Sequence, residues 1–191
     1  MSSSTDALPV TGLPVRVAKD ARIVLTGAAG LVGQNLVVEL KAQGYTRLVA
    51  IDKHGHNLAI LRKLHPDVEA IEADLAEPGP WSGAFAGAAV VVQLHAQITG
   101  KTRDLFDRNN LVATRHVLDA CRQHAVPYLV HISSSVVNSV ARDDYTDTKK
   151  AQEKMVVGSG LAHCVLRPTL MFGWFDPKHL GWLSRFMART P

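Results

Sequence analysis

Short apolar runs alternate along the chain with stretches that repeat apolar residues at helical spacing. The first run, Ile23–Leu25, predicts a buried strand. The stretch after it predicts a helix, with apolar residues at Leu31, Val32, Leu36, Val37 and Leu40. Gly44 would end this helix.

The same patterns recur along the chain as far as residue 187. They predict five further strands, over residues 47–51, 68–73, 88–94, 128–132 and 161–166. They also predict helices over residues 57–64, 105–124, 145–157 and 179–187, with one helical turn over 81–85. Strands that alternate with helices form right-handed β-α-β units around a parallel sheet. The predicted fold class is therefore α/β, with a doubly wound parallel sheet over residues 21–174.

Three glycines in the first turn, Gly27, Gly30 and Gly33, have the spacing of a dinucleotide-binding loop. In a Rossmann-like sheet the first glycine allows a tight turn and the second lets backbone approach a pyrophosphate. The third allows close packing of helix on strand, and the helix N-terminus then faces the anion. The alternative interpretation is a plain strand-turn-helix with glycines for tightness.

Asp52 ends the second predicted strand, nineteen residues after Gly33. A carboxylate at this position can accept hydrogen bonds from the ribose hydroxyls of NAD, and it would repel the 2′-phosphate of NADP. NAD is therefore favoured over NADP. Lys53 could nevertheless tolerate a phosphate.

Polar residues follow most of the other predicted strands. They are Asp74, His95-Ala96-Gln97, Ser133-Ser134-Ser135 and Thr169. Each alone is typical of a cap or turn. Together they indicate a ligand site, because the carboxyl ends of parallel strands share one edge of the sheet.

Ser135, Tyr145 and Lys149 carry the candidate chemistry. Tyr145 and Lys149 are one helical turn apart and would share a helix face. A neighbouring ammonium favours the phenolate, which could take a hydroxyl proton while hydride leaves the same carbon for nicotinamide. The Ser135 hydroxyl would hold the substrate oxygen. The alternative is an exposed helix start with a solvated lysine.

Composition and charge limit the classes of function that the chain can have. The 191 residues include 47% hydrophobic and 20% charged residues, with a net charge of +4, as in a globular protein. Lys and Arg are scattered, so no nucleic-acid surface is predicted, and no apolar run reaches the ~18 residues of a membrane span. Cys121 and Cys164 form no disulfide framework or metal motif, so we predict no metal site and a cytoplasmic location. Residues 1–20 lack a secretory pattern and predict a flexible lead-in.

Taken in order, these motifs resemble the extended short-chain dehydrogenase/reductases, which include NAD-dependent epimerases and dehydratases. The matching pieces are Thr26-Gly27-x-x-Gly30-x-x-Gly33, Asp52, Asp74-Leu75, Asn110-x-x-x-Thr114, Ser133-Ser134-Ser135, Tyr145-x-x-x-Lys149 and Leu166-Arg167-Pro168 with Gly173. The resemblance implies an NAD-dependent enzyme acting on a secondary alcohol or ketone, with a sugar or nucleotide-sugar as substrate.

The resemblance also implies further cofactor contacts. Leu31 and Val32 would meet the pyrophosphate, and Asp74 and Leu75 would flank adenine. The remaining residues implied to lie near the cofactor are Leu94, His95, Ala96, Asn110, Pro168 and Thr169, with Tyr145 and Lys149 at its nicotinamide end. We interpret His95 as a packed or capping residue, not a catalytic one, because no acidic partner adjoins it.

The chain departs from the family pattern at several places. Leu170 stands where epimerases usually have an Asn that contacts the nucleotide-sugar, and the segment from Ser135 to Tyr145 is short. Family members continue into a substrate lobe, of which residues 175–191 would be only the start. A non-catalytic NAD(P)-binding sensor or scaffold is the alternative function. A homodimer through helices 105–124 and 145–157 is the arrangement that the family suggests.

Overall fold

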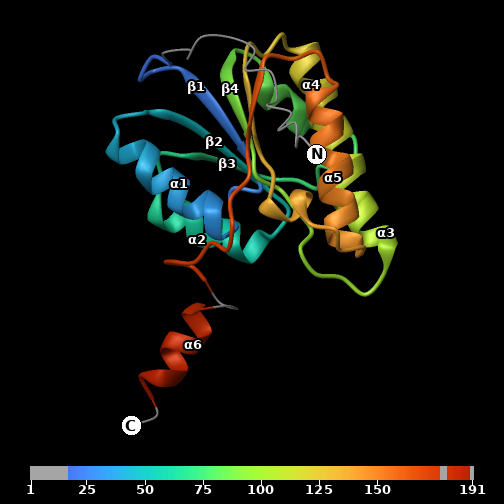
Figure 1. The fold of residues 1–191 in the computed structure, drawn as a ribbon. Coiled ribbons are helices and arrows are strands. Elements are labelled where there is room, and N and C mark those ends of the chain that lie inside the picture. Colours follow the sequence, from blue (N-terminus) through green and yellow to red (C-terminus); the bar gives the residue numbers. More distant parts are fainter. Residues whose placement is uncertain (1–16, 177–179, 190–191) are drawn as a thin grey trace, which may run out of the picture.

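A six-stranded parallel sheet lies at the centre of the computed structural model, which describes residues 17–176 and 180–189 (Figure 1). The strands are β1 (Arg22–Thr26), β2 (Arg47–Asp52), β3 (Glu69–Glu72), β4 (Ala88–Gln93), β5 (Leu129–Ile132) and β6 (His163–Leu166). Their order in the sheet is β3-β2-β1-β4-β5-β6, and every pairing is parallel. The order reverses between β1 and β4, where such sheets bind ligands. The predicted fold class is confirmed.

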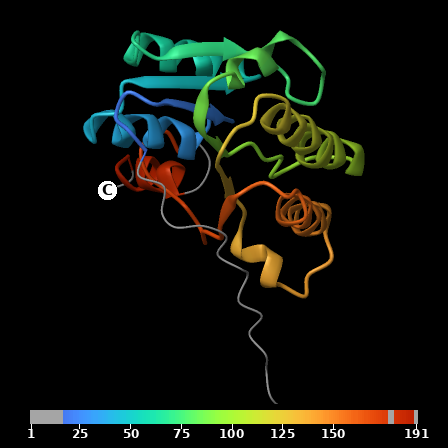
Figure 2. The same cartoon turned by 90° about the horizontal axis from the view of Figure 1, so that it is seen from above.

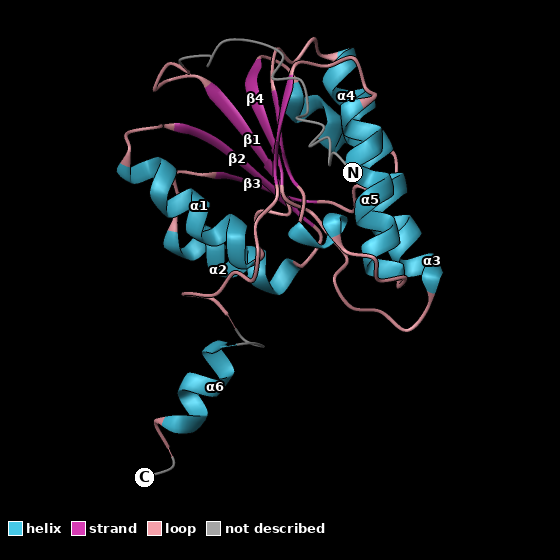
Figure 3. Ribbon diagram, in the orientation of Figure 1, coloured by secondary structure: helices cyan, strands magenta, loops and turns pink. Residues whose placement is uncertain are grey.

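Helices cover both faces of this sheet (Figures 2 and 3). On one face lie α1 (Leu31–Ala42) and α2 (Gly55–Leu64), and their Val37 and Leu61 pack on Leu25 and Ala50. The other face carries the 3-10 turn η1 (Pro80–Phe85), α4 (Ala113–Gln123) and α5 (Asp144–Val157). The sequences of the central strands are therefore nearly continuous apolar runs, because both faces of these strands are buried.

The predicted helix over residues 105–124 is interrupted. It consists of α3 (Arg103–Phe106), a π-helical stretch η2 (Asp107–Val112) and α4. Two consecutive side chains of this stretch, Asn109 and Asn110, are buried. Elsewhere the ends of predicted elements differ from the observed ones by at most two residues, as expected for fraying ends.

The structure describes part of each segment that the sequence predicts to flank the Rossmann-like domain. Most of the predicted lead-in lies outside the described residues. Its described end is tied to the domain, because the Thr46 N–H donates to Lys19 O at 3.0 Å and Val17 packs on the core. At the other end, α6 (Leu180–Met187) extends away from the sheet, with Trp182 and Phe186 stacked at 5.5 Å (Figure 1). Among residues 17–176 and 180–189, no helix has the length and apolar character needed to cross a membrane.

Candidate active site

One cavity of about 500 Å³ opens at the carboxyl edge of the sheet and receives residues from the loops after all six strands. Predicted site residues that line it are Gly27, Gly30, Leu31, Val32, Gly33, Asp52, Lys53, Asp74, Leu75, Leu94, His95, Ala96, Ser135, Tyr145, Pro168 and Thr169. Two predicted residues, Asn110 and Lys149, are buried behind its wall and do not line it. Polar strand ends that are far apart in the sequence are thus brought together.

Gly27 turns the chain out of β1 with a φ of +71°. A Cβ there would lie 2.6 Å from the His95 backbone nitrogen, so the loops after β1 and β4 touch through this glycine. A Cβ on Gly33 would lie 2.5 Å from Ala28 Cα. Gly27 therefore makes the tight turn, and Gly33 has the close packing, that the sequence predicts for them.

The N-terminus of α1 faces the cavity, and no side chain at this helix start occupies its free N–H groups. Its N-cap is Gly30, no side chain caps it, and its first turn contains no acidic residue. Helix geometry leaves the N–H groups of Leu31 and Val32 without intrahelical acceptors. These donors and the positive end of the helix dipole suit a diphosphate. The residues present therefore fit a dinucleotide.

Asp52 connects the glycine loop to the end of β2. Its side chain is 6% exposed and accepts hydrogen bonds from the Ala29 N–H and the His54 N–H, each at 2.9 Å. His54 Nδ1 also lies 2.9 Å from Oδ1 of this carboxylate. A carboxylate has about four acceptor positions, so one remains for a ribose hydroxyl. Lys53 donates to Asn109 Oδ1 at 2.6 Å, so its ammonium is already bonded to a neutral partner.

Two further cavity residues have perturbed ionisation. Burial opposes ionisation of Asp74, but the Ala76 N–H and the Arg108 guanidinium outweigh it and hold the pKa of Asp74 below its ordinary value. Burial lowers the pKa of His95 to about 3, with the charge of Lys149 adding to the effect. His95 is therefore neutral, with Nδ1 lying 2.9 Å from Thr26 Oγ1, which agrees with its interpretation as a packed residue.

Ser135 and Tyr145 both line the cavity on its β5–β6 side. Ser135 opens the turn η3 (Ser135–Asn138), and its N–H donates to Pro168 O at 2.9 Å, which joins the loops after β5 and β6. Tyr145 lies in the first turn of α5 and is half-buried.

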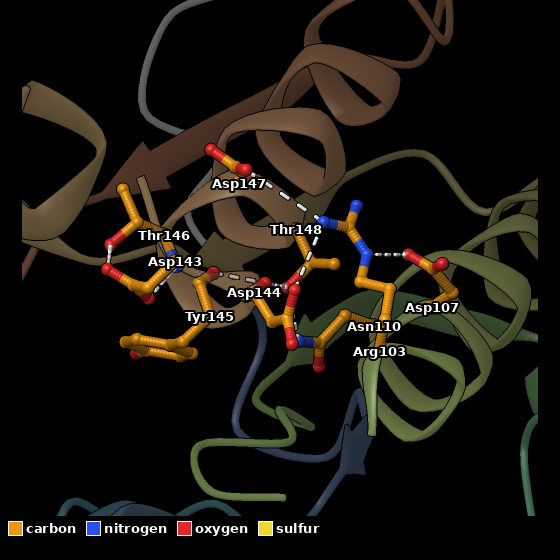
Figure 4. Close-up of polar contacts among 9 residues, drawn as sticks. All are labelled: Arg103, Asp107, Asn110, Asp143, Asp144, Tyr145, Thr146, Asp147 and Thr148. Atoms are coloured by element: carbon orange, nitrogen blue, oxygen red, sulfur yellow. Dashed lines mark hydrogen bonds and ion pairs between the residues drawn. The ribbon is translucent and has the colours of Figure 1, made fainter. Parts of the chain in front are cut away.

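The start of α5 is fixed from two sides (Figure 4). Asp143 caps the helix by accepting from the Thr146 N–H at 2.9 Å. Asn110 donates to Thr148 Oγ1 at 3.0 Å, which ties the π-helical stretch to α5. Arg103 lies between Asp107, at 2.8 Å, and Asp144, at 3.5 Å. Tyr145 is thus presented from a well-anchored helix end.

Lys149 is 1% exposed, and its ammonium donates to Ile132 O at 3.1 Å and Gln152 Oε1 at 2.6 Å. Burial lowers its pKa to about 8, although Glu153 opposes this. The buried cation lies on the same helix as Tyr145, one turn further along. The interpretation of Lys149 as a solvated surface residue is therefore wrong.

Sequence reasoning missed several polar residues at this site. Asn109 donates to Gln97 Oε1 at 2.7 Å and lines the cavity, and Gln152 holds Lys149. Asn109 adjoins the predicted Asn110 in the sequence, but only the tertiary structure shows that Asn109 is the one that lines the cavity. Gln152 had no signal in the sequence, because its role depends on contacts between α4 and α5.

A family model described as NAD dependent epimerase/dehydratase matches residues 23–190. The chain belongs to this family. The resemblance read from the motifs is confirmed, and so is NAD as the cofactor that the family uses. Being a family member also supports classification with NAD-dependent enzymes.

Curated relatives in or near this family are about one quarter identical to the chain. The ceramide reductase of Caulobacter vibrioides is 27% identical over 182 residues, which cover 92% of this chain and 54% of that protein. The sterol-4-alpha-carboxylate 3-dehydrogenase, decarboxylating, of Bos taurus is 26% identical over 190 residues, covering 88% and 51%. The chain thus spans about half the length of these relatives.

Solved structures of other proteins share the fold, and one of them is an epimerase. The UDP-glucuronic acid 4-epimerase of Bacillus cereus, in complex with NAD, superposes with a TM-score of 0.70 at 24% identity. That superposition covers 81% of this chain and 58% of the epimerase. The protein Pen of Bacillus thuringiensis has a TM-score of 0.75 at 12% identity, covering 90% and 56%.

Proposed function

We propose that this chain is the NAD-binding part of an oxidoreductase of the epimerase/dehydratase type that acts on a secondary alcohol or ketone. The observation that carries the proposal is one cavity lined by Gly30, Asp52, Ser135 and Tyr145 together. The dinucleotide features and the candidate chemistry thus lie on opposite walls of the same space. The membership of the chain in an NAD dependent family supports the same function.

The chain's own residues would hold the dinucleotide in an extended form along the strand ends. Leu31 and Val32 N–H groups would bind the pyrophosphate, and Asp52 would accept from a ribose. Asp74 and Leu75 would flank the adenine, while Pro168 and Thr169 would border the nicotinamide. Bound NAD supplies a hydride acceptor at its nicotinamide ring.

Tyr145 would act as the base. Its phenolate would take the proton of a substrate hydroxyl as hydride leaves the same carbon, so that the alcohol becomes a ketone. The Ser135 hydroxyl would donate to the substrate oxygen and hold it in place. The buried positive charge of Lys149 on the same helix would favour the phenolate.

For the substrate, the family resemblance predicts a sugar or nucleotide-sugar. A specific observation favours a second class, a lipid-like alcohol. Ile98, Leu170 and Met171 line the cavity, and Leu170 is 63% exposed. Several curated relatives are named for apolar substrates, among them the ceramide reductase and a 3 beta-hydroxysteroid dehydrogenase/Delta 5-->4-isomerase of Mycobacterium tuberculosis, which is 26% identical.

The first experiment separates an enzyme from a non-catalytic NAD(P)-binding sensor or scaffold. NADH binding is followed by nucleotide fluorescence, and turnover of NAD is measured with two probes, UDP-galactose and a 3β-hydroxysteroid in detergent. Tyr145→Phe should lower turnover about a hundredfold or more and leave NADH affinity unchanged. Tyr128→Phe is the matched control, because Tyr128 packs on the core away from the cavity lining.

Three outcomes would count against parts of this proposal. Unchanged turnover in Tyr145→Phe removes the tyrosine from the reaction. Nucleotide binding without turnover of either probe favours the sensor or scaffold. Turnover of UDP-galactose alone overturns the lipid-like substrate.

A further inference from the structure

A buried polar chain runs behind the cavity wall and ends on Lys149. Gln152 is fully buried and bonds in two directions. Its Oε1 accepts from Lys149 Nζ at 2.6 Å, and its Nε2 donates to Thr114 Oγ1 at 2.9 Å. An amide that is bonded at both ends has one orientation, so the oxygen must face the lysine.

Thr114 continues this chain of hydrogen bonds towards the cavity. Its hydroxyl oxygen also accepts from Gln93 Nε2 at 2.6 Å, which leaves its proton to face His95 Nε2, 3.4 Å away. His95 in turn lines the cavity and lies 2.9 Å from Thr26 at the end of β1. The chain of contacts therefore links α5, α4 and the loop after β4.

The charged groups around Lys149 do not replace this anchor. Glu153 is the carboxylate that acts on Lys149, but its oxygens already accept from Ser133 and Arg167. From β5, His131 faces the lysine as a neutral ring, because burial lowers its pKa well below the ordinary value. His95 is neutral for the same reason. A buried ammonium needs hydrogen-bond acceptors, and here they are a carbonyl and the Gln152 amide.

We propose that Gln152 is a positioning residue that fixes the buried Lys149 ammonium, one helical turn after Tyr145 on α5, and joins it, through Thr114, to the cavity wall at His95. Gln152 touches neither the cavity nor the predicted substrate position, so it acts only through Lys149. The proposal rests on the proposed function for its catalytic meaning. The anchoring of Lys149 can nevertheless be measured without turnover.

Three variants separate anchoring from simple packing. Gln152→Met keeps the length of the side chain and removes the acceptor. Gln152→Glu keeps an acceptor oxygen and adds a negative charge. Gln123→Met, on the exposed end of α4, is the matched control.

Titration of isotope-labelled lysine ε-carbons by NMR is the primary measurement, with the Lys149 signal assigned from Lys149→Arg. Loss of an acceptor disfavours the charged form, so Gln152→Met should move the Lys149 titration down by about one pH unit. Gln152→Glu should move it up, and Gln123→Met should leave it in place. Should Gln152→Met fail to fold, the upward shift in Gln152→Glu still tests the anchor.

Turnover provides the second measurement. Gln152→Met should lower kcat about tenfold and change the KM for NAD less than twofold, with Gln152→Glu retaining more of kcat. An unmoved Lys149 titration in both variants would overturn this proposal and leave the enzyme proposal standing. Retained turnover in Tyr145→Phe would instead remove the tyrosine from the reaction, and the titration result would remain.

Discussion

The two halves of the sheet bury different kinds of side chain. Around β1–β3 the interior is mainly apolar, as in the packing of Leu25, Ala50 and Leu61, and its few buried polar residues are Thr26, Gln34 and Asp52. Around β4–β6 the interior includes Gln93, Thr114, His131, Lys149 and Gln152, all nearly or fully buried. The first half would bind the dinucleotide through backbone geometry and one carboxylate. The second half holds buried ionisable groups in fixed positions.

This difference follows from the cost of burying polar groups. Apolar packing tolerates many arrangements, but a buried amide or ammonium is stable only where its partners meet it. Lys149 is bonded to residues of β5 and α5, and Gln152 reaches α4. The second half is therefore specified by contacts between elements, and the first half by short segments.

The largest expected effect lies in the first half, at Gly27. Gly27→Ala should lower the free energy of unfolding by about 4 kcal/mol, the sum of a left-handed alanine and a clash with the His95 backbone. It should also weaken NADH binding at least about a hundredfold, because the loop after β1 must move. Urea unfolding and fluorescence titration measure the two effects.

Gly44→Ala is the matched control for that variant. Its φ is +87° and a Cβ there meets no atom within 4 Å. It should cost only about 1 kcal/mol and leave NADH affinity unchanged. Equal effects at the two glycines would mean that the contact with His95 is unimportant.

In the second half, the buried lysine predicts a pH-dependent stability. The folded state holds the pKa of Lys149 at about 8 against an ordinary 10.5, so the unfolded chain binds more protons between these pH values. The free energy of unfolding should therefore rise through this window. By its upper end the gain should be about 3 kcal/mol relative to Lys149→Met, which lacks the titrating group.

Urea unfolding of both proteins at pH steps from 7 to 11 gives this difference. Lys150→Met on the same helix should follow the wild-type curve. A difference between wild type and Lys149→Met that stays constant with pH would show that Lys149 does not titrate in this window.

The smallest expected effect lies where the halves meet, at the hydrogen bond from Lys53 to Asn109. Asn109→Leu should release the ammonium towards a 2′-phosphate and raise NADPH affinity relative to NADH about fivefold, as for an exposed ion pair. Lys53→Met in the same background should cancel the gain. If the affinity for NADPH relative to NADH is the same in both variants as in the wild type, Asp52 alone determines the choice of cofactor.

Agreement between sequence and structure was best where signals are short-range. The glycine spacing and the position of Asp52 after an apolar run placed both features on the observed cavity, because strand, turn and helix follow one another directly. The π-helical stretch could not be foreseen, because its extra residue is stabilised by the contacts of Asn109 and Asn110 with distant loops.

By itself, the sequence determined the α/β class, the alternation of strands and helices, and the set of polar residues at the strand ends. Only the tertiary structure decided which of them face the cavity, since Lys149 and Asn110 lie behind its wall and Asn109 lies on it. Local periodicity sets which face of an element is apolar. Where a buried polar side chain points depends instead on the partner that compensates its desolvation, and that partner is distant in the sequence.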